Sequence, residues 1–235
     1  MRKFRNWLFW PTFVVCTVLV FITIFIGWMT RSHRLVSKAA WLWGVAVLWA
    51  SGVKLEVVGK IPEGGPFVVV PNHSSVLDIA AALVLCENQL NFRFVSRQSW
   101  FWIPVFGQAA LFAGCPAVNR KKPKRFNQRR GKLKHFVRGQ SLMMFAEGTR
   151  TLDGTIGKFK GGAFSLAAEH DVPILPVRFR GLYESMPKHK YLPKMLTAKA
   201  YIGPPMRVLS TAKADRLKAG EEVRNWIINA GQPSS

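Results

Sequence analysis

Two short polar segments follow apolar runs and carry side chains suited to acid–base chemistry and anion binding. The first reads PNHSSVLD over residues 71–78, directly after the apolar residues 67–70. Asp78 falls about one turn into the helix predicted next, so its carboxylate can reach one nitrogen of the His73 imidazole and leave the other nitrogen basic. Such a pair can act as a general base. Taken alone, a histidine at a strand end is more often a capped or surface residue.

The second segment reads FAEGTR over residues 145–150 and carries groups suited to a phosphate. Gly148 permits close approach of the backbone, the Thr149 hydroxyl can donate a hydrogen bond, and Arg150 can form a bidentate pair with a phosphate. The alternative is an ordinary polar turn in which Glu147 and Arg150 pair with each other.

The elements that must position these segments alternate between strands and helices. Strands are predicted at residues 54–58, 67–70, 92–95, 113–118, 141–146, 173–179 and 198–202, and helices at 75–86, 101–112, 124–138, 162–170 and 214–230. The helix at 101–112 is expected to break near Pro104 and Gly107. Alternation of this kind predicts an α/β fold with a largely parallel sheet covered by helices. In such sheets the chemistry lies at the strand ends, in the loops that lead into helices.

The N-terminal residues predict a membrane-embedded helical region ahead of that sheet. No charged residue lies between Arg5 and Arg31, and the apolar run 7–29 is long enough to cross a hydrocarbon core. No small-residue cleavage site follows it, so a signal peptide is not favoured. A second apolar stretch, 39–53, is too short to span comfortably. It favours a helix at the interface or dipping into one leaflet, and a core helix of the soluble domain is the alternative.

The chain is therefore divided into two parts. We predict membrane-anchoring helices over residues 1–53 and a single α/β domain over residues 54–235. Lys and Arg flank the first apolar run at both ends, so the positive-inside rule gives no clear asymmetry. A hairpin with both flanks on the cytoplasmic side agrees with positive charge at both ends of the run.

The charge of the chain indicates an anionic partner. Lys and Arg number 34 against 12 Asp and Glu, a net charge of +22, which attracts nucleic acid, anionic headgroups, acidic proteins or phosphorylated small molecules. A weak strand ends at Arg120, and residues 120–138 hold ten Lys or Arg and no acidic residue. This stretch is either a solvated basic helix or an electrostatic platform beside the site. A nucleic-acid-binding protein is the non-enzymatic alternative, although no nucleic-acid motif is recognised.

Together the polar segments resemble the glycerolipid acyltransferase family, which includes lysophosphatidic acid acyltransferases. Four family motifs occur in order: NHxxxxD at Asn72, His73 and Asp78, an apolar strand running into Arg120, FAEGTRT at residues 145–151 for the usual FPEGTRS, and an apolar strand with an internal proline at residues 172–177. The resemblance covers roughly residues 50–210. Two departures are Ala146 in place of the usual proline and Arg97 where many members have lysine.

The resemblance implies transfer of a fatty acyl chain from a thioester, acyl-CoA or acyl–acyl carrier protein, to the free hydroxyl of lysophosphatidic acid, which gives phosphatidic acid. His73 would be the general base and Asp78 would orient it. The substrate-binding set that holds the acceptor would be Arg120, Glu147, Gly148, Thr149 and Arg150. No metal, no organic cofactor and no covalent acyl-enzyme are implied.

The same motifs are compatible with other acceptors and with one cellular location. The alternatives are another lysophospholipid, glycerol 3-phosphate or a lyso-aminolipid. Because thioester donors are cytoplasmic, the expected location is the inner (cytoplasmic) membrane, with the catalytic domain facing the cytoplasm. No nucleic acid is expected as a partner. Three scattered cysteines, Cys16, Cys86 and Cys115, suit a reducing compartment.

Overall fold

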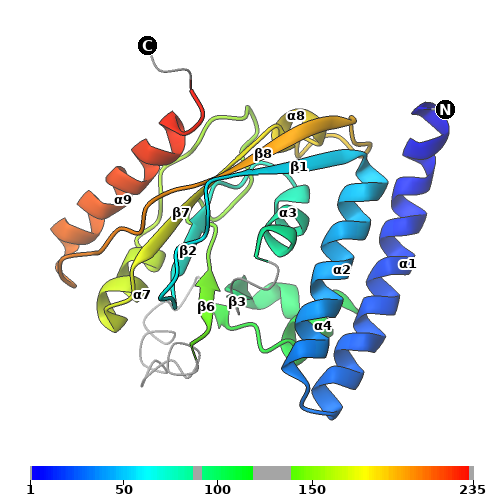
Figure 1. The fold of residues 1–235 in the computed structure, drawn as a ribbon, viewed down its shortest axis with the longest axis horizontal. Coiled ribbons are helices and arrows are strands. Elements are labelled where there is room, and N and C mark those ends of the chain that lie inside the picture. Colours follow the sequence, from blue (N-terminus) through cyan, green and yellow to red (C-terminus); the bar gives the residue numbers. More distant parts are fainter. Residues whose placement is uncertain (1, 87–91, 119–138, 233–235) are drawn as a thin grey trace.

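The computed structural model describes residues 2–86, 92–118 and 139–232. An N-terminal hairpin of two helices, α1 (Arg2–Met29) and α2 (His33–Ser51), leads into a sheet that helices cover on both faces (Figure 1). The Ser32 side chain accepts a hydrogen bond from the Leu35 N–H and begins α2, and Gly52, with φ of 71°, ends it. The run Phe9–Met29 is long and apolar enough to cross a membrane.

The second apolar stretch forms part of the protein core along one face of α2. Val47 and Leu48 are buried in the same apolar cluster as Val69 of the sheet. Gly44 makes this close packing possible, because a Cβ atom there would lie 2.8 Å from the carbonyl oxygen of Ala80. The opposite face of α2 exposes Leu42, Val45 and Trp49. The core-helix interpretation therefore describes one face of α2, and the opposite face is exposed.

The main sheet has six strands in the order β1-β8-β7-β2-β6-β3. The strands are β1 (Val53–Val58), β2 (Val68–Pro71), β3 (Phe92–Phe94), β6 (Ser141–Met143), β7 (Ile174–Arg180) and β8 (Leu196–Ile202). All neighbours are parallel except β7 and β8, which are antiparallel. The predicted α/β fold with a largely parallel sheet is thus confirmed.

Alternating side chains of β2 contribute to two separate cores. Val69 packs with Leu77 of α3 (Leu77–Leu85) on the face toward α1 and α2. Val68 and Val70 pack with Phe164 on the other face. That face is covered by α7 (Gly162–His170) and α9 (Lys213–Asn229). A strand buried on both sides explains why residues 67–70 are uniformly apolar.

Other elements differ from the predictions in detail. The strand expected at 113–118 is only β5 (Ala117–Val118), which pairs with β4 (Ser96–Arg97) outside the main sheet. The expected break at 101–112 occurs between a 3-10 helix, η1 (Gln98–Trp102), and α4 (Phe106–Phe112). A short helix, α8 (Leu182–Ser185), was not predicted. The basic helix expected at 124–138 lies outside the described residues.

Candidate active site

His73 and Asp78 form the centre of the site. His73 lies two residues beyond the end of β2, and its Nδ1 lies 2.9 Å from Oδ2 of Asp78. Asp78 belongs to the first turn of α3 and is 0% exposed. With Nδ1 bound to the carboxylate, Nε2 is the nitrogen left to exchange a proton with a ligand.

Backbone groups hold the Asp78 carboxylate in place. Its Oδ2 also accepts hydrogen bonds from the N–H groups of Ser74 (2.6 Å) and Ser75 (2.8 Å). The Ser75 hydroxyl donates to the Met186 carbonyl and accepts from the Leu77 N–H. The loop between β2 and α3 is therefore held by hydrogen bonds within it and by one bond to Met186. Asp78 cannot turn away from His73 without leaving the N–H groups of the loop unpaired.

Asn72 attaches the same loop to β7. Its side-chain nitrogen donates to the carbonyl of Phe179, and its side-chain oxygen accepts from the Phe179 N–H at 2.7 Å. The amide thus continues the pairing of β2 with β7 beyond the end of the ladder. Asn72 is buried, and its role here is to position the histidine that follows it.

The segment after β6 holds His73 from the other side. Glu147 Oε1 accepts the His73 N–H at 2.7 Å, and the Thr151 N–H donates to the His73 carbonyl at 3.0 Å. The second Glu147 oxygen accepts the Gly157 N–H at 3.0 Å. Within the described chain Glu147 forms no ion pair with Arg150, so the interpretation of residues 145–150 as a turn closed by that pair is wrong.

Glu147→Gln tests this arrangement through the pH dependence of stability. Burial raises the pKa of the Glu147 carboxyl, although hydrogen bonds from the His73 and Gly157 N–H groups oppose the shift. The folded protein therefore binds this proton more tightly than the unfolded chain, and the free energy of unfolding should fall as pH rises from about 4 through the folded pKa. Urea titrations across that range should show this slope in the wild type and a flatter one in Glu147→Gln.

The exposed Glu63 supplies the control, because Glu63→Gln should keep the wild-type slope. Below about pH 4, where Glu147 is protonated, the Glu147→Gln protein should be less stable than the wild type, since an amide can accept through only one of its two terminal atoms. Equal slopes for wild type and Glu147→Gln would show that Glu147 is not held as described.

Aromatic rings support the imidazole. The His73 ring stacks on Phe145, with centroids 4.0 Å apart and planes at 20°. Phe145 in turn stacks with Phe94 at 6.2 Å. Phe145 belongs to the FAEGTR segment, but no role was predicted for it. The only indication in the sequence was its position two residues before Glu147.

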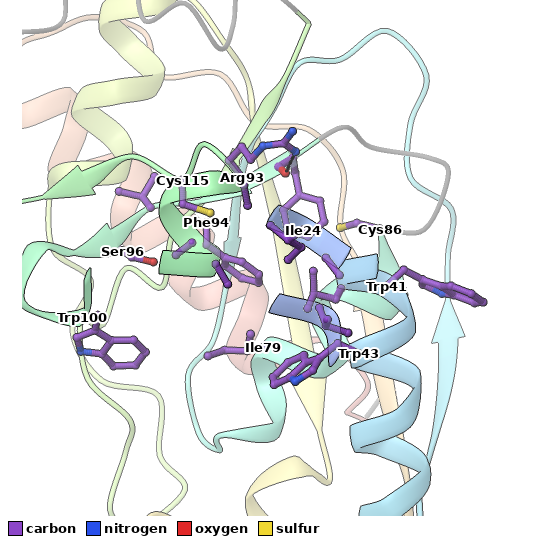
Figure 2. A pocket seen from close by; sticks show the side chains of 18 of the residues that line it. Ile24, Trp41, Trp43, Ile79, Cys86, Arg93, Phe94, Ser96, Trp100 and Cys115 are labelled. Carbon is purple, nitrogen blue, oxygen red and sulfur yellow. Dashed lines mark hydrogen bonds between the residues drawn. The ribbon is translucent and has the colours of Figure 1, made fainter. Parts of the chain in front are cut away.

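A cavity of about 1120 Å³ opens in front of these groups. His73, Phe145, Gly148, Thr149 and Arg150 form part of its lining. Most of the remaining wall comes from α1, α2, α3, β3 and α4, and Figure 2 shows Ile24, Trp43, Ile79 and Phe94 around one space. Residues expected only to anchor the chain thus also line the site.

Two of the three free cysteines border the cavity without offering a nucleophile. Burial raises the pKa of the Cys86 thiol and that of the Cys115 thiol, although the nearby Arg93 opposes the second shift. A thiol with a raised pKa is a poor source of thiolate. The chemistry therefore centres on the imidazole.

The structure brings together most of the predicted site residues. His73 is hydrogen-bonded to both Asp78 and Glu147, and it lines the same cavity as Gly148, Thr149 and Arg150. Arg120 lies outside the described residues. The individual roles of these residues remain predictions.

Comparison with known proteins decides the family. The sequence model described as "Acyltransferase" matches residues 53–180, more than half of the 235-residue chain. The chain belongs to the acyltransferase family. The resemblance found in its motifs is thereby confirmed.

Curated relatives of this acyltransferase share one activity in their names. It is 30% identical over 182 residues to a chloroplastic 1-acyl-sn-glycerol-3-phosphate acyltransferase of Arabidopsis thaliana, covering 75% of this chain and 49% of that one. A probable 1-acyl-sn-glycerol-3-phosphate acyltransferase of Mycoplasma genitalium is 33% identical over 167 residues, with coverage of 69% and 59%. The chain spans about half the length of the first of these relatives.

A solved structure matches the whole chain. The 1-acyl-sn-glycerophosphate acyltransferase PlsC of Thermotoga maritima superposes with a TM-score of 0.77 and 25% sequence identity, covering 100% of both chains. The N-terminal hairpin, the mixed sheet and the covering helices of this acyltransferase therefore occur together in a known fold.

Proposed function

We propose that this acyltransferase moves a fatty acyl chain from a thioester donor, acyl-CoA or acyl–acyl carrier protein, to the free hydroxyl of lysophosphatidic acid. The observation that carries the proposal is the His73–Asp78 pair, whose imidazole lines a large, mainly apolar cavity. The relatives named above, which carry this activity in their names, support the choice of acceptor.

His73 would act as the general base. Its Nε2 takes the proton of the acceptor hydroxyl as the oxygen attacks the thioester carbonyl. The tetrahedral intermediate then collapses, the carbon–sulfur bond breaks, and the imidazolium returns the proton to the leaving thiolate. Asp78 keeps Nδ1 protonated and stabilises the imidazolium while it exists. The products are phosphatidic acid and the free thiol carrier.

The loop after β6 would hold the acceptor's phosphate. Gly148, Thr149 and Arg150 line the cavity beside His73, and Arg150 has no ion pair among the described residues that would compete for its guanidinium. Arg120 belongs to the same proposed set. Glu147 serves this set indirectly, because both of its oxygens are engaged by backbone N–H groups. Fixing phosphate and hydroxyl together orients the attack.

The apolar part of the cavity would hold acyl chain. Its volume slightly exceeds the roughly 300–1,000 Å³ of ordinary ligand pockets, and its walls include Val20 and Ile24 of α1, Trp43 of α2 and Leu83 of α3. Of these helices, α1 and α2 are the ones that we propose to lie in the membrane. An acyl chain could thus stay in apolar surroundings during the reaction.

We propose that α1 and α2 lie in one leaflet of the inner membrane with the domain on the cytoplasmic side. Phe9, near the start of α1, and Ile24, near its end, are both buried against the rest of the protein. The domain therefore accompanies α1 along its length, and a crossing helix would draw the domain into the bilayer. Exposed side chains such as Val15, Leu19 and Ile26 would face the lipid.

Assays against an acceptor panel test the proposed function, with Arg150→Ala as the informative variant. Wild type should acylate lysophosphatidic acid in preference to glycerol 3-phosphate, other lysophospholipids and a lyso-aminolipid. Loss of the Arg150–phosphate bond should cost about 2 kcal/mol because the side chain is only half-buried, close to a thirtyfold rise in the acceptor KM. The KM of the thioester should change much less.

The matched control is Arg207→Ala, which removes an exposed arginine that pairs with Asp171. It should leave both KM values unchanged. A fall in kcat without a change in acceptor KM would contradict phosphate binding by Arg150. A preference for a phosphate-free acceptor would overturn the choice of lysophosphatidic acid.

A further inference from the structure

The segment from η1 to α4, residues 98–112, presents large apolar side chains to the outside. Trp102 is 83% exposed and Leu111 is 61% exposed, and Trp100 and Ile103 are also exposed. A cluster of exposed aromatic and aliphatic side chains is unfavourable in water and marks an interaction surface. We call these four side chains the aromatic wedge.

The wedge continues the lipid-facing surface of α1. Phe112, at the end of α4, lies with its ring centroid 5.3 Å from that of Phe25 and 4.9 Å from that of Trp28. Ala109 and Ala113 pack on the cluster that contains Ile24. The segment therefore lies beside the C-terminal half of α1, whose Phe25, Trp28 and Met29 are themselves exposed.

A tight turn between η1 and α4 holds the side chains of the wedge on the protein surface. Val105, between the two helices, has φ of 66°, which is unfavourable for a β-branched residue. Hydrogen bonds from the Gly107 N–H to Ile103 and from the Ala109 N–H to Val105 hold this turn. A Cβ atom at Gly107 would lie 2.3 Å from the Phe101 oxygen. The backbone of Gly107 thus packs directly on the backbone of Phe101. No space for a side chain is left between them, and Trp102 and Ile103 lie on the outside of the turn.

Positive charge borders the wedge. Arg97 precedes η1. Arg31 lies in the turn between α1 and α2, and Arg34 and Lys38 lie in the first two turns of α2; all four are exposed. Aromatic side chains beside lysines and arginines are typical of a protein surface at the boundary between headgroups and acyl chains. Arg34, Arg97 and Trp100 also line the cavity, so the cavity reaches the surface beside the wedge.

We propose that the aromatic wedge inserts into the same leaflet as α1, as a second membrane contact made by the catalytic domain itself. The occupant of this surface is a phospholipid monolayer with anionic headgroups. The contact holds the cavity opening at headgroup depth, and an acceptor reaches His73 from the leaflet without passing through water. The inference rests on the proposed function for the acceptor, but the membrane contact can be measured without turnover.

Spin labelling measures the contact directly. A nitroxide is attached to Trp102→Cys and to Leu209→Cys in nanodiscs of phosphatidylethanolamine and phosphatidylglycerol, with the labelled unsubstituted protein as baseline. Leu209 is the matched position, because it is 82% exposed. Its neighbour Val208 packs against the apolar cluster that contains Phe164 of α7 and Val223 of α9, on the face of the sheet opposite the α1 and α2 side. The label at position 102 should collide more with oxygen than with a water-soluble nickel chelate, and the label at position 209 should show the reverse.

Kinetics give the functional consequence. Leu111→Ser together with Trp102→Ser should lower kcat/KM about tenfold for acceptor presented in vesicles of the same lipids, because less apolar surface enters the leaflet. Leu209→Ser should leave it unchanged. With short-chain donor and acceptor below their micellar concentrations, all three proteins should have equal rates.

The outcomes separate the two proposals. Equal nickel accessibility at positions 102 and 209 overturns the wedge, whatever the activity. A loss of rate in the Trp102→Ser, Leu111→Ser protein with short-chain substrates as well as with vesicles also overturns it. The two substitutions would then have impaired the active site itself and not the contact with lipid. If no acceptor is acylated in any format, the proposed function fails while the labelling result stands.

Discussion

Replacing His73 with alanine is expected to lower kcat by about 10²–10⁴-fold and to leave binding of the lysolipid largely intact. The reason is geometric. Nδ1 lies 2.9 Å from Asp78, and the ring is stacked on Phe145. The N–H and the carbonyl of His73 are both hydrogen-bonded to the segment after β6. An imidazole held in this way is suited to the proposed reaction, in which its remaining nitrogen, Nε2, accepts and returns a proton.

The measurement is single-turnover acylation with a labelled thioester, alongside equilibrium binding of lysophosphatidic acid. Folding of the variant is checked by circular dichroism, because the backbone bonds of residue 73 do not need the imidazole. His189→Ala removes an exposed histidine and should retain full activity. A folded His73→Ala protein with more than about a tenth of wild-type activity would sink the assignment of His73 as general base.

The contact between His73 and Asp78 could be predicted from sequence because it is local. Both residues lie in one eight-residue segment, and the start of α3 determines where the carboxylate points. The proximity of Glu147 was also accessible in principle. Each segment follows an apolar strand, and parallel strands place their carboxyl ends at the same edge of a sheet. The pairing of β2 with β6 does this.

The cavity could not be predicted in the same way. In α1 and α2 apolar residues occur on both the exposed and the buried sides, so hydrophobic periodicity does not distinguish the two sides. Gly27 in α1 and Gly44 in α2 were local signs that another helix approaches closely. The stacking of Phe145 on His73 depends on the side-chain conformations of two residues from different strand ends, which spacing does not encode. Arg120 was predicted from a motif alone and lies outside the described residues.

Two replacements of Asp78 should separate its chemical role from its structural one. Asp78 accepts hydrogen bonds from His73, Ser74 and Ser75 through the same oxygen, Oδ2. In Asp78→Asn the amide oxygen can occupy that position and keep all three bonds, while the amide nitrogen replaces Oδ1 near the Ser74 hydroxyl, 3.4 Å away. The variant then lacks only the negative charge that stabilises the imidazolium. We expect it to fold normally and to lose about 10²-fold in kcat, somewhat less than His73→Ala.

Asp78→Ala removes the acceptor itself. Two N–H groups at a fully buried position are left without a partner, each costing about 1–3 kcal/mol, so the melting temperature should fall well below that of Asp78→Asn. The comparison uses thermal unfolding and kcat for both variants under the same conditions. Full activity of Asp78→Asn would remove Asp78 from the proton transfer. Equal loss of stability in both variants would show that the amide cannot reproduce the bonds to Ser74 and Ser75, and that the charge itself holds the loop before α3.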